Sequence, residues 1–516
     1  MDPNYHTLIR QTVVAACIGM LLLFIATTLH QINWVCAIAT LGVLVYSGGH
    51  FFINAWLALK AKQYNRELLI AIAIGTNWLY AVFTQQLYFE TIVIIIIVNL
   101  GLILEQYYYK NIDLKDMNID ITNSGNKIAT IIIPSVIAIA LVTAIIWYLI
   151  GKQPVSFYML VSFMSILLIA SPTALQLAIP TSIISGISKA AQSEILINNA
   201  NILQTICKIN TVILNKTATI TLGKPIVTAI TTVPGVDPNQ VLSIAASLES
   251  GSDHPYALAI LAAATATQLS VAIASNQQNF AALGINGIIA GQPACIGNKS
   301  FMEAQLVKID MLRDHAKDFA KTGVTTIYVA NNKQLIGLLT LTDPIKTDAK
   351  FLVQKLHDMQ IRVIMITGDQ QLTAEAIAQQ VGITEVIADV MPQEKANKIA
   401  ELQHEDAIVA MVSNGLNDEE ALIQADVGFA MNADVTLINS SLDNIVETIY
   451  ISKATVNNMR HNLLGAVIYN MVAIPFAAGI LFPFTGLLLN PMLAAVAMIL
   501  SSLTVVINAN RLQFLI

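Results

Sequence analysis

Three short runs of aliphatic and β-branched residues end abruptly in polar loops. TVIL precedes Asn215, VIMI precedes Thr367 and AIVAMV precedes Ser413. In open α/β sheets the chemistry lies just beyond the carboxyl ends of the strands, so we expect these loops to form one candidate site. The first loop opens with Asn215, whose amide nitrogen has no lone pair available for attack and whose oxygen is uncharged. This residue therefore cannot supply the nucleophile of covalent catalysis.

The chain around these loops is far more apolar than an ordinary soluble protein. Of its 516 residues 55% are hydrophobic and only 12% are charged, whereas soluble proteins are about a quarter charged. Apolar runs long enough to cross a bilayer are predicted at residues 11–29, 34–58, 67–83, 87–107, 128–150, 156–188, 460–482 and 488–510. The sequence therefore predicts about eight transmembrane helices, with a polar region between the sixth and the seventh.

Basic residues are unevenly distributed between the ends of these predicted helices. The turns at 30–33, 84–86 and 484–487 contain no Lys or Arg, and the turn at 151–155 contains only Lys152. On the opposite side lie Lys60, Lys62, Arg66, Lys110 and Lys115. The positive-inside rule then places both termini and the polar region in the cytoplasm. We expect a multi-pass protein of the plasma or inner membrane, with its first apolar run retained as a span.

The polar region alternates β-branched runs with helical stretches, which is typical of an α/β domain with a parallel sheet. The expected fold class is an α-helical membrane bundle joined to a cytoplasmic α/β domain that carries an inserted α+β domain. The expected boundaries are 1–107 for four transmembrane helices, 108–127 for a short cytoplasmic linker, 128–188 for helices five and six, 189–224 and 341–455 for the α/β domain, 225–340 for the insertion, and 456–516 for two C-terminal helices.

Cysteine usage and net charge argue against three features. The four cysteines, Cys17, Cys36, Cys207 and Cys295, form no CxxC pair. This argues against a disulfide framework and against a cysteine-based metal-binding head. The formal net charge of −6 is mild and suggests no nucleic-acid partner.

The polar loops resemble the motifs of the heavy-metal-transporting, copper-type P-type ATPases. NKTATITLGKP at 215–225 resembles the DKTGT phosphorylation signature, and NGLND at 414–418 resembles the hinge motif GDGxND. TGD at 367–369 and Lys395 in MPQEK resemble the second loop and the phosphate-binding lysine. The resemblance implies a haloacid dehalogenase-like phosphorylation domain that uses ATP and Mg²⁺. The implied catalytic positions are Asn215, Lys216, Thr217, Thr367, Gly368, Asp369 and Lys395, and the implied magnesium positions are Asn414, Asn417 and Asp418.

The resemblance extends into the insertion and the membrane. SGSDHPYALAI resembles the family's His-Pro pair, SPTALQLAIP resembles its CPC helix, and Gly48-Gly49 resembles the kink of its second helix. The implied nucleotide-binding positions are His254, Pro255 and Gly284. The implied positions for the transported metal are Ser171, Pro172, Thr173, Tyr469, Asn470, Met498 and Ser502.

The chain departs from the family pattern at several of these positions. Asn215 and Asn414 stand where the family has the two carboxylates that hold Mg²⁺, a hard cation that prefers carboxylate oxygen. Ala218 and Ala282 replace glycines of the phosphorylation signature and of the nucleotide domain's GxG. Hydroxyls at 171 and 173 replace the thiolates that soft Cu(I) prefers.

A further departure lies between the fourth and fifth predicted helices. There the family has an actuator domain whose TGE loop hydrolyses the phosphoenzyme. This chain has only the short linker at that point, and TGE occurs nowhere in the sequence.

Each substituted position also has a simpler interpretation. The two asparagines could be ordinary turn residues, and His254 could be a surface histidine. Met498 could pack in the core, and the polar residues near it could simply hold membrane helices together.

Taken together, the departures predict a non-catalytic pseudo-ATPase with residual nucleotide or metal binding or a regulatory role. The alternative is a functional ATP-driven exporter of copper or another heavy metal, which would need a replacement for each loss. Phosphatase activity of the α/β domain would require the same missing aspartate. The expected partners are the lipid bilayer, ATP, and Cu(I) or another heavy-metal ion bound weakly.

Overall fold

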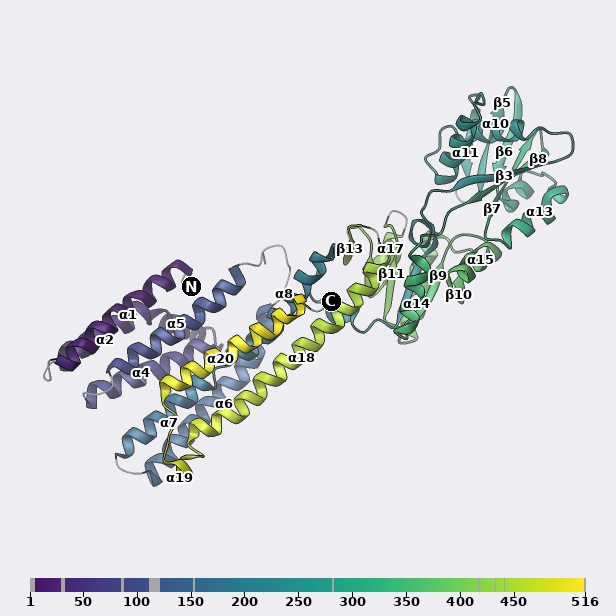
Figure 1. Cartoon of the computed structure of the whole chain (residues 1–516). Helices are drawn as coiled ribbons and strands as arrows, with labels where there is room; N and C mark the ends of the chain where they lie inside the picture. Colours follow the sequence, from purple (N-terminus) through teal and green to yellow (C-terminus); the bar gives the residue numbers. More distant parts are fainter. Residues whose placement is uncertain are drawn as a thin grey trace. The chain divides into compact units, whose positions relative to one another are not determined.

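The computed structural model describes residues 5–28, 33–84, 88–110, 121–151, 154–280, 283–415, 418–431, 433–439 and 441–514 (Figure 1). Contacts within the chain divide it into two compact units. Residues 1–192, 199–203 and 451–516 form the helical unit, and residues 193–198 and 204–450 form the α/β unit. These limits lie close to the predicted boundaries at 188 and 455.

The helical unit contains the predicted transmembrane helices. Its helices are α1 (Tyr5–Thr28), α2 (Asn33–Ser47), α3 (Gly49–Lys60), α4 (Arg66–Thr84), α5 (Tyr88–Lys110), α6 (Ile121–Ile150), α7 (Val155–Ile169), α8 (Thr173–Gln192), α18 (Asp443–Ala478, which begins in the α/β unit), α19 (Phe482–Thr485), α20 (Pro491–Asn510) and the 3-10 turn η2 (Arg511–Phe514). Within the described residues, seven spans are long and apolar enough to cross a membrane, or eight if the bent pair α2–α3 is one span. The predicted helical membrane bundle is therefore confirmed.

Two of these spans are broken where the sequence weakens the helix. The axes of α2 and α3 meet at 57°, beside the Gly48-Gly49 pair where a kink was expected. A Cβ on Gly48 would lie 2.9 Å from the carbonyl oxygen of Leu44, so only glycine fits this bend without a shift. Helices α7 and α8 are separated at Ser171-Pro172, because proline favours the first turn of a new helix over the interior of an old one.

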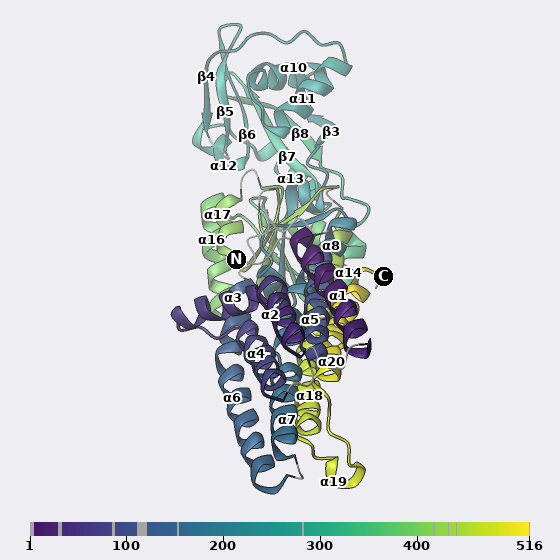
Figure 2. The same cartoon turned by 90° about the vertical axis from the view of Figure 1, so that its left-hand side faces the viewer.

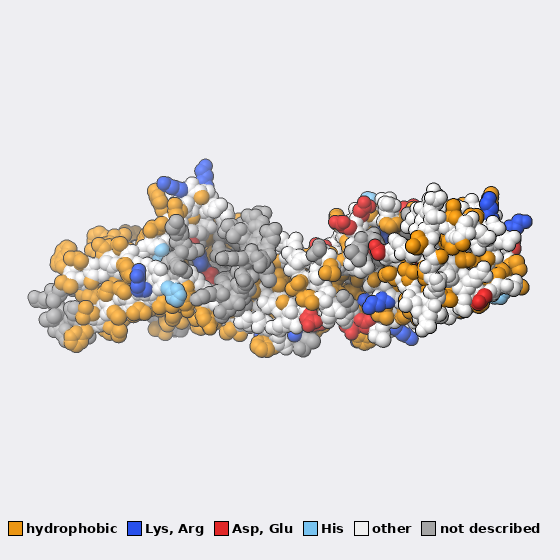
Figure 3. Space-filling view, turned by 90° about the horizontal axis from the view of Figure 1, so that it is seen from above, with side chains coloured by type: hydrophobic (Ala, Val, Ile, Leu, Met, Phe, Trp, Pro, Cys, Tyr) orange, Lys and Arg blue, Asp and Glu red, His pale blue; other side chains and the backbone are white. Residues whose placement is uncertain are grey.

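The surface of the helical unit is apolar, as a lipid-facing surface requires. Large hydrophobic side chains such as Met20, Ile38 and Val142 are more than half exposed. In the space-filling view, hydrophobic side chains cover much of the described surface of this unit, whereas charged side chains are more frequent on the α/β unit (Figure 3). Lipid tails can cover these side chains without the cost of exposing them to water.

The α/β unit is built on a seven-stranded sheet with the order β1-β13-β12-β11-β2-β9-β10. All neighbours are parallel except β1 and β13. The strands are β1 (Ile195–Ile197), β2 (Thr211–Asn215), β9 (Arg362–Ile366), β10 (Glu385–Ile387), β11 (Val409–Val412), β12 (Val427–Phe429) and β13 (Val435–Leu437). The accompanying helices are α9 (Ile202–Ile206), α14 (Ala349–Asp358), α15 (Gln371–Val381), α16 (Pro392–His404) and α17 (Glu419–Gln424). Every residue of β2 and β11 is buried, as expected for central strands of a covered parallel sheet.

The insertion forms a six-stranded antiparallel sheet with the order β3-β8-β7-β6-β5-β4. Its strands are β3 (Ile226–Thr232), β4 (Ser275–Phe280), β5 (Gly284–Ile289), β6 (Gln292–Gly297), β7 (Thr325–Asn331) and β8 (Gln334–Thr342), and its helices are α10 (Pro238–Glu249), α11 (Pro255–Ala266), α12 (Lys299–Ala304) and α13 (Asp310–Ala320) (Figure 2). Ile296 packs with α10 and α11, whereas its neighbour Cys295 packs with α12 and α13. The alternation of side chains along a strand therefore places a helix pair on each face.

Two element boundaries differ from the prediction. Helix α18 begins at Asp443 and not near residue 460, and α6 begins at Ile121, inside the predicted linker 108–127. Hydropathy detects only the part of a helix that is apolar enough for lipid, whereas backbone hydrogen bonding continues the helix beyond it. Residues 111–120 of the predicted linker lie outside the described residues.

One glycine in the helical unit fixes a close helix crossing, and this generates a stability prediction. A Cβ on Gly186 of α8 would lie 2.1 Å from the hydroxyl oxygen of Thr455 in α18. Gly186→Ala should therefore destabilise the protein by roughly 1–3 kcal/mol, the usual cost of overpacking, measured as a lower thermal unfolding temperature in detergent. Gly465→Ala is the matched control, because a Cβ there would contact nothing within 4 Å. Equal unfolding temperatures for the two variants would contradict the close crossing.

Candidate functional site

The carboxyl ends of three adjacent strands carry the predicted phosphorylation loops. β2 lies between β11 and β9 and is parallel to both. Asn215 is the last residue of β2, Thr367 directly follows β9, and Ser413 directly follows β11. The structure thus brings the three loops to one edge of the sheet, as the sequence predicted.

Asn215 is held in a buried network of hydrogen bonds. Its side-chain Nδ2 donates to Asp418 Oδ2 over 2.6 Å, and its Oδ1 lies 3.4 Å from the Nζ atom of Lys395. The Lys395 ammonium also forms an ion pair with Asp418 Oδ1 at 2.7 Å, and the Ser413 hydroxyl donates to Asp418 Oδ2. All four side chains are buried. The amide is therefore fixed with its N–H directed at the neighbouring carboxylate.

A second charged pair lies beside this network. Lys216, which follows Asn215, forms an ion pair with Asp369 of the second loop. Burial favours a lower pKa for Lys216, but the nearby charges of Tyr256 and Asp369 outweigh it and leave the pKa above its ordinary value. Thr367 Oγ1 accepts a hydrogen bond from the backbone N–H of Asp369 and so holds the loop in place. Lys216 is thus a protonated lysine neutralised by the chain's own carboxylate.

The donor set at this edge does not fit a resident magnesium ion. Both Asp418 oxygens are engaged, one by an ammonium and the other by an amide N–H and a hydroxyl. Asn414 is exposed and carries an amide, and Asn417 lies outside the described residues. An amide N–H repels a cation at the position where Mg²⁺ requires an oxygen ligand.

Ala218 adopts a backbone conformation that normally requires glycine. Its φ is +59° and its ψ is 9°, a left-handed conformation that costs a residue with a Cβ about 1–2 kcal/mol. The Cβ of Ala218 lies close to Gly223. A Cβ added to Gly223 would lie 2.6 Å from the Ala218 Cβ. Thr217 lies half-buried in the same loop.

Asp343 fixes the other end of this loop, and the sequence analysis missed it. Its carboxylate accepts hydrogen bonds from the Thr221 hydroxyl and from the backbone N–H groups of Gly223 and Lys224. These residues form the two connections between the insertion and the parallel sheet. The available sequence signal for this role was the pair Asp343-Pro344, which directly follows strand β8.

The insertion contributes a cavity of about 240 Å³ within the α/β unit. His254 and Gly284 both line it, together with Gly368 and Asp369. Pro255 begins helix α11, and the His254 Nδ1 atom caps that helix by accepting from the Tyr256 N–H. Burial lowers the pKa of His254, so this side chain is neutral at physiological pH. Ala282 lies outside the described residues.

Glu249 lines the same cavity and was not identified from the sequence. Its side chain is only 8% exposed, and burial raises its pKa from 4.5 to about 7, opposed by a hydrogen bond from Ser252. A close approach between two glycines shapes the wall beside it, because a Cβ on Gly284 would lie 2.7 Å from Gly297 Cα. A glutamate at the C-terminus of an apolar helix gave no distinctive sequence signal.

The predicted positions for the transported metal are only partly brought together. Thr173, Met498 and Ser502 line one pocket of the helical unit, and the Ser171 and Thr173 hydroxyls bond each other over 2.9 Å across Pro172. Tyr469 and Asn470 lie half-buried on α18 and do not line this pocket. Among the described residues no group of three or more His, Cys, Asp or Glu side chains is placed to hold a metal ion.

Comparison with known proteins gives consistent similarities. Residues 209–426 match the family of haloacid dehalogenase-like hydrolases. The chain is 42% identical over 399 residues to a copper-exporting P-type ATPase of Vibrio cholerae, covering 76% of this chain and 44% of the relative. It is 38% identical to a silver-exporting P-type ATPase of Salmonella typhimurium, covering 74% and 47%. The chain thus spans about half the length of these relatives.

The fold is also that of a solved transporter. A zinc-transporting PIB-type ATPase in the E2.Pi state superposes with a TM-score of 0.67 at 20% identity, covering 98% of this chain and 99% of that one. The predicted haloacid dehalogenase-like domain with its insertion is therefore confirmed.

The network around Asn215 generates a prediction about magnesium. Asn215→Asp should place two carboxylates within hydrogen-bond distance in a buried site, and should destabilise the protein by on the order of 3 kcal/mol in EDTA. Mg²⁺ at a hundredfold above its Kd should restore about 2.7 kcal/mol, whereas the wild-type chain should not respond. Thermal unfolding in detergent with and without Mg²⁺ measures both effects. Asn215→Ala is the control, and a magnesium response in that variant would contradict this account of the site.

Glu249 generates a prediction about pH. The folded chain binds the Glu249 proton more tightly than the unfolded chain, so this contribution to stability is fully present below pH 4.5 and is lost as the pH rises to about 7. The loss corresponds to roughly 3 kcal/mol. Glu249→Gln should remove this part of the pH dependence of thermal unfolding between pH 4.5 and 8, whereas Glu303→Gln, at a half-exposed side chain, should leave it intact. Identical pH profiles for wild type and Glu249→Gln would refute the assignment.

Proposed function

We propose that this chain, which belongs to the heavy-metal-transporting P-type ATPases, is a non-catalytic member of that family. In this proposal the chain folds and inserts into a membrane, but it forms no phosphoenzyme and does not pump. It retains nucleotide binding, weak metal binding or a regulatory role.

The observation that carries the proposal is the orientation of the Asn215 amide. An acceptor of the γ-phosphoryl group must present a free, charged oxygen to phosphorus. Asn215 instead donates its N–H to Asp418 over 2.6 Å, and its uncharged oxygen lies 3.4 Å from the Lys395 ammonium. The position of the expected nucleophile is therefore occupied by a hydrogen-bond donor held by two neighbours.

The same network argues against magnesium-assisted phosphoryl transfer. In that reaction metal ions neutralise the charge that develops on the transferred group. Here Lys395 and the Asn215 amide occupy the carboxylate of Asp418, and the exposed Asn414 offers no second carboxylate. Two formal negative charges that would attract the ion are missing.

The lack of an actuator domain supports the proposal independently. Helix α5 ends at Lys110 and α6 begins at Ile121, so residues 111–120 are all that separates them. A segment of that length is far too short to fold as a domain, and no TGE loop occurs elsewhere in the chain. Even a phosphorylated chain would lack the group that positions the attacking water.

The cavity of the insertion supports retained nucleotide binding. It combines a neutral histidine, a buried glutamate and close-packed glycine backbone with the Gly368-Asp369 loop. Ligand sites are commonly such cavities, with a few polar groups in a largely apolar wall. ATP is therefore the proposed ligand, bound without hydrolysis, and the lipid bilayer is the proposed surrounding of the helical unit. A plasma or inner membrane is the proposed location.

The alternative function is a working ATP-driven exporter of copper or another heavy metal. The identity of 42% to a copper-exporting relative favours it. It would require another nucleophile, another magnesium ligand set and another way to hydrolyse the phosphoenzyme. Acid-stable incorporation of ³²P from ATP separates the two functions.

The decisive prediction concerns the wild-type chain and a double variant. Wild-type protein should incorporate no acid-stable phosphate, because losing a catalytic nucleophile typically lowers the rate about a millionfold. Asn215→Asp combined with Asn414→Asp restores both carboxylates beside Lys216, Asp369 and Lys395. This variant should accumulate phosphoenzyme while steady-state ATP hydrolysis stays near background, since no TGE loop is present.

Asn215→Ala combined with Asn414→Asp is the matched control, because it restores the outer carboxylate without a nucleophile. It should remain unlabelled. Metal-stimulated labelling of wild-type protein, free of any contaminating pump, would establish the exporter in place of the pseudo-ATPase. Rapid turnover of the double aspartate variant would mean that another part of the chain hydrolyses the phosphoenzyme.

A further inference from the structure

Lys395, Asn215 and Asp418 place an amine, an amide and a carboxylate in mutual contact inside the α/β unit, and we call them the amide triad. Asp418 Oδ1 lies 2.7 Å from the Lys395 Nζ atom, and Asp418 Oδ2 accepts from Asn215 Nδ2 over 2.6 Å. The third distance, from Lys395 Nζ to Asn215 Oδ1, is 3.4 Å. One carboxylate therefore bridges the amine nitrogen and the amide nitrogen, while the amine lies against the amide carbonyl.

The Lys395 nitrogen lies within reach of the amide carbon. Asn215 Cγ is bonded to Oδ1, so the Nζ–Cγ distance differs from 3.4 Å by at most the length of a C=O bond, about 1.2 Å. Atoms poised to react lie about 3–3.5 Å apart, and this limit includes that range. Asp418 holds the nitrogen end of the amide, so the carbonyl cannot turn away from Lys395 without breaking a hydrogen bond.

The amide triad is removed from water. Asn215 is 7% exposed, Lys395 is 6% exposed and Asp418 is 2% exposed. An ammonium–carboxylate pair in such a place carries a desolvation cost, and transfer of one proton from Nζ to Asp418 removes both charges. The neutral amine that results has a lone pair with which to attack a carbonyl carbon.

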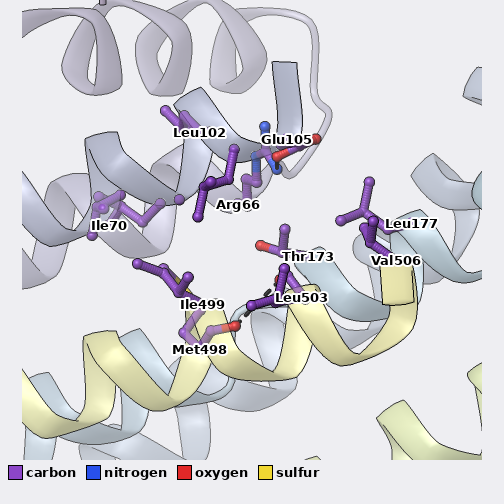
Figure 4. A pocket seen from close by; sticks show the side chains of 14 residues that line it. Arg66, Ile70, Leu102, Glu105, Thr173, Leu177, Met498, Ile499, Leu503 and Val506 are labelled. Carbon is purple, nitrogen blue, oxygen red and sulfur yellow. Dashed lines mark hydrogen bonds and ion pairs between the residues drawn. The ribbon is translucent and has the colours of Figure 1, made fainter. Parts of the chain in front are cut away.

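Among the described residues, the other buried ion pairs lack the amide. Lys216 pairs with Asp369. Arg66 pairs with Glu105 at the wall of a pocket in the helical unit, as Figure 4 shows. Neither pair includes an acyl group that an amine could attack. The amide triad therefore differs from them in chemistry and not only in position.

We propose that Lys395 and Asn215 form a site of spontaneous covalent modification, in which an isopeptide bond joins Nζ to Cγ. Asp418 accepts one proton from the Lys395 ammonium, and the neutral Nζ forms a bond to Asn215 Cγ. The Cγ–Nδ2 bond breaks as Asp418 passes its proton to Nδ2. Nζ releases a second proton to the departing ammonia, which leaves as ammonium, and the third proton stays on the new amide. No atom is oxidised or reduced, and no co-reactant is required.

Proximity supplies the reactivity that an ordinary amide lacks. Groups held in reacting geometry reach effective concentrations of about 10⁵–10⁸ M. The bond joins β2 to α16 and constrains the unfolded chain in the way that a disulfide does. This inference goes beyond the proposed function, because a chain without a nucleophile fails to form a phosphoenzyme whether or not the bond is present.

Intact-mass measurement and a tryptic map of the purified full-length chain test the inference. The intact mass should be lower than that of the sequence by one ammonia molecule. Trypsin does not cleave after an acylated lysine, so residues 209–216 and 363–398 should appear as one branched peptide joined at Asn215 and Lys395. Without the bond, trypsin cleaves after Lys395 and yields residues 209–216 and 363–395 as separate linear peptides.

Three variants assign the roles within the amide triad. Lys395→Arg removes the primary amine, and Asp418→Asn removes the group that accepts and returns the proton, so both should yield only linear peptides. Lys216→Arg is the matched control, because it replaces the neighbouring buried lysine, whose ion pair is with Asp369, and keeps the tryptic site. This variant should retain the branched peptide.

Only linear peptides from wild type overturn the inference, whether or not the variants fold. A linear 209–216 peptide with aspartate at position 215 also overturns it, because water then replaced Lys395 as the attacking group. A branched peptide that persists in Asp418→Asn overturns the role of Asp418. Phosphoenzyme formation by wild type would refute the proposed function, whereas linear peptides without a phosphoenzyme would refute this inference alone, so the two failures are distinguishable.

Discussion

A charge removed from water must be neutralised, and this constraint governs both units of the chain. Lys395 pairs with Asp418, Lys216 with Asp369, and Arg66 with Glu67 and Glu105. Removing one partner of such a pair typically costs about 3–5 kcal/mol, because a buried charge is then left alone. In each place the counter-charge is covalently part of the protein. A chain arranged in this way is stable without exchangeable ions, and for the same reason it has few unsatisfied charges left with which to bind them.

Much of the architecture could be predicted from the sequence because periodicity and length determine it. The apolar runs became the membrane helices, and the runs before Asn215, Thr367 and Ser413 became adjacent parallel strands. The family motifs then located the loops. The partners of their side chains could not be predicted in the same way. That Asn215 would direct its N–H toward Asp418 follows from the pairing of β2 with β11, because the loop after β11 carries Asp418, which is distant from Asn215 in sequence.

Other features carried no sequence signal of their own. Glu249 is an ordinary glutamate until the fold buries it beside His254 in one cavity. Arg66 counted only as a cytoplasmic basic residue in the prediction of topology, and its contact with Glu105, which lies on another helix, depends on how α4 packs against α5. Ala218 was recognised as a substitution, but only the structure shows that its backbone is left-handed, a conformation that is costly for a residue with a Cβ. The sequence shows which residues differ from the family pattern, whereas the fold determines the structural effect of each difference.

The packing around Asn215 also bears on the chemical ageing of the protein. An asparagine in a mobile loop loses its amide as ammonia when the next backbone nitrogen attacks the side-chain carbonyl, and water then opens the resulting succinimide to aspartate or isoaspartate. That reaction requires the side chain to swing toward the following peptide. Here the backbone is extended, with ψ at 146°, and both ends of the amide are held by Asp418 and Lys395. The contacts of Asn215 with Asp418 and Lys395 thus slow its spontaneous deamidation. They thereby prevent the return of an aspartate at this position.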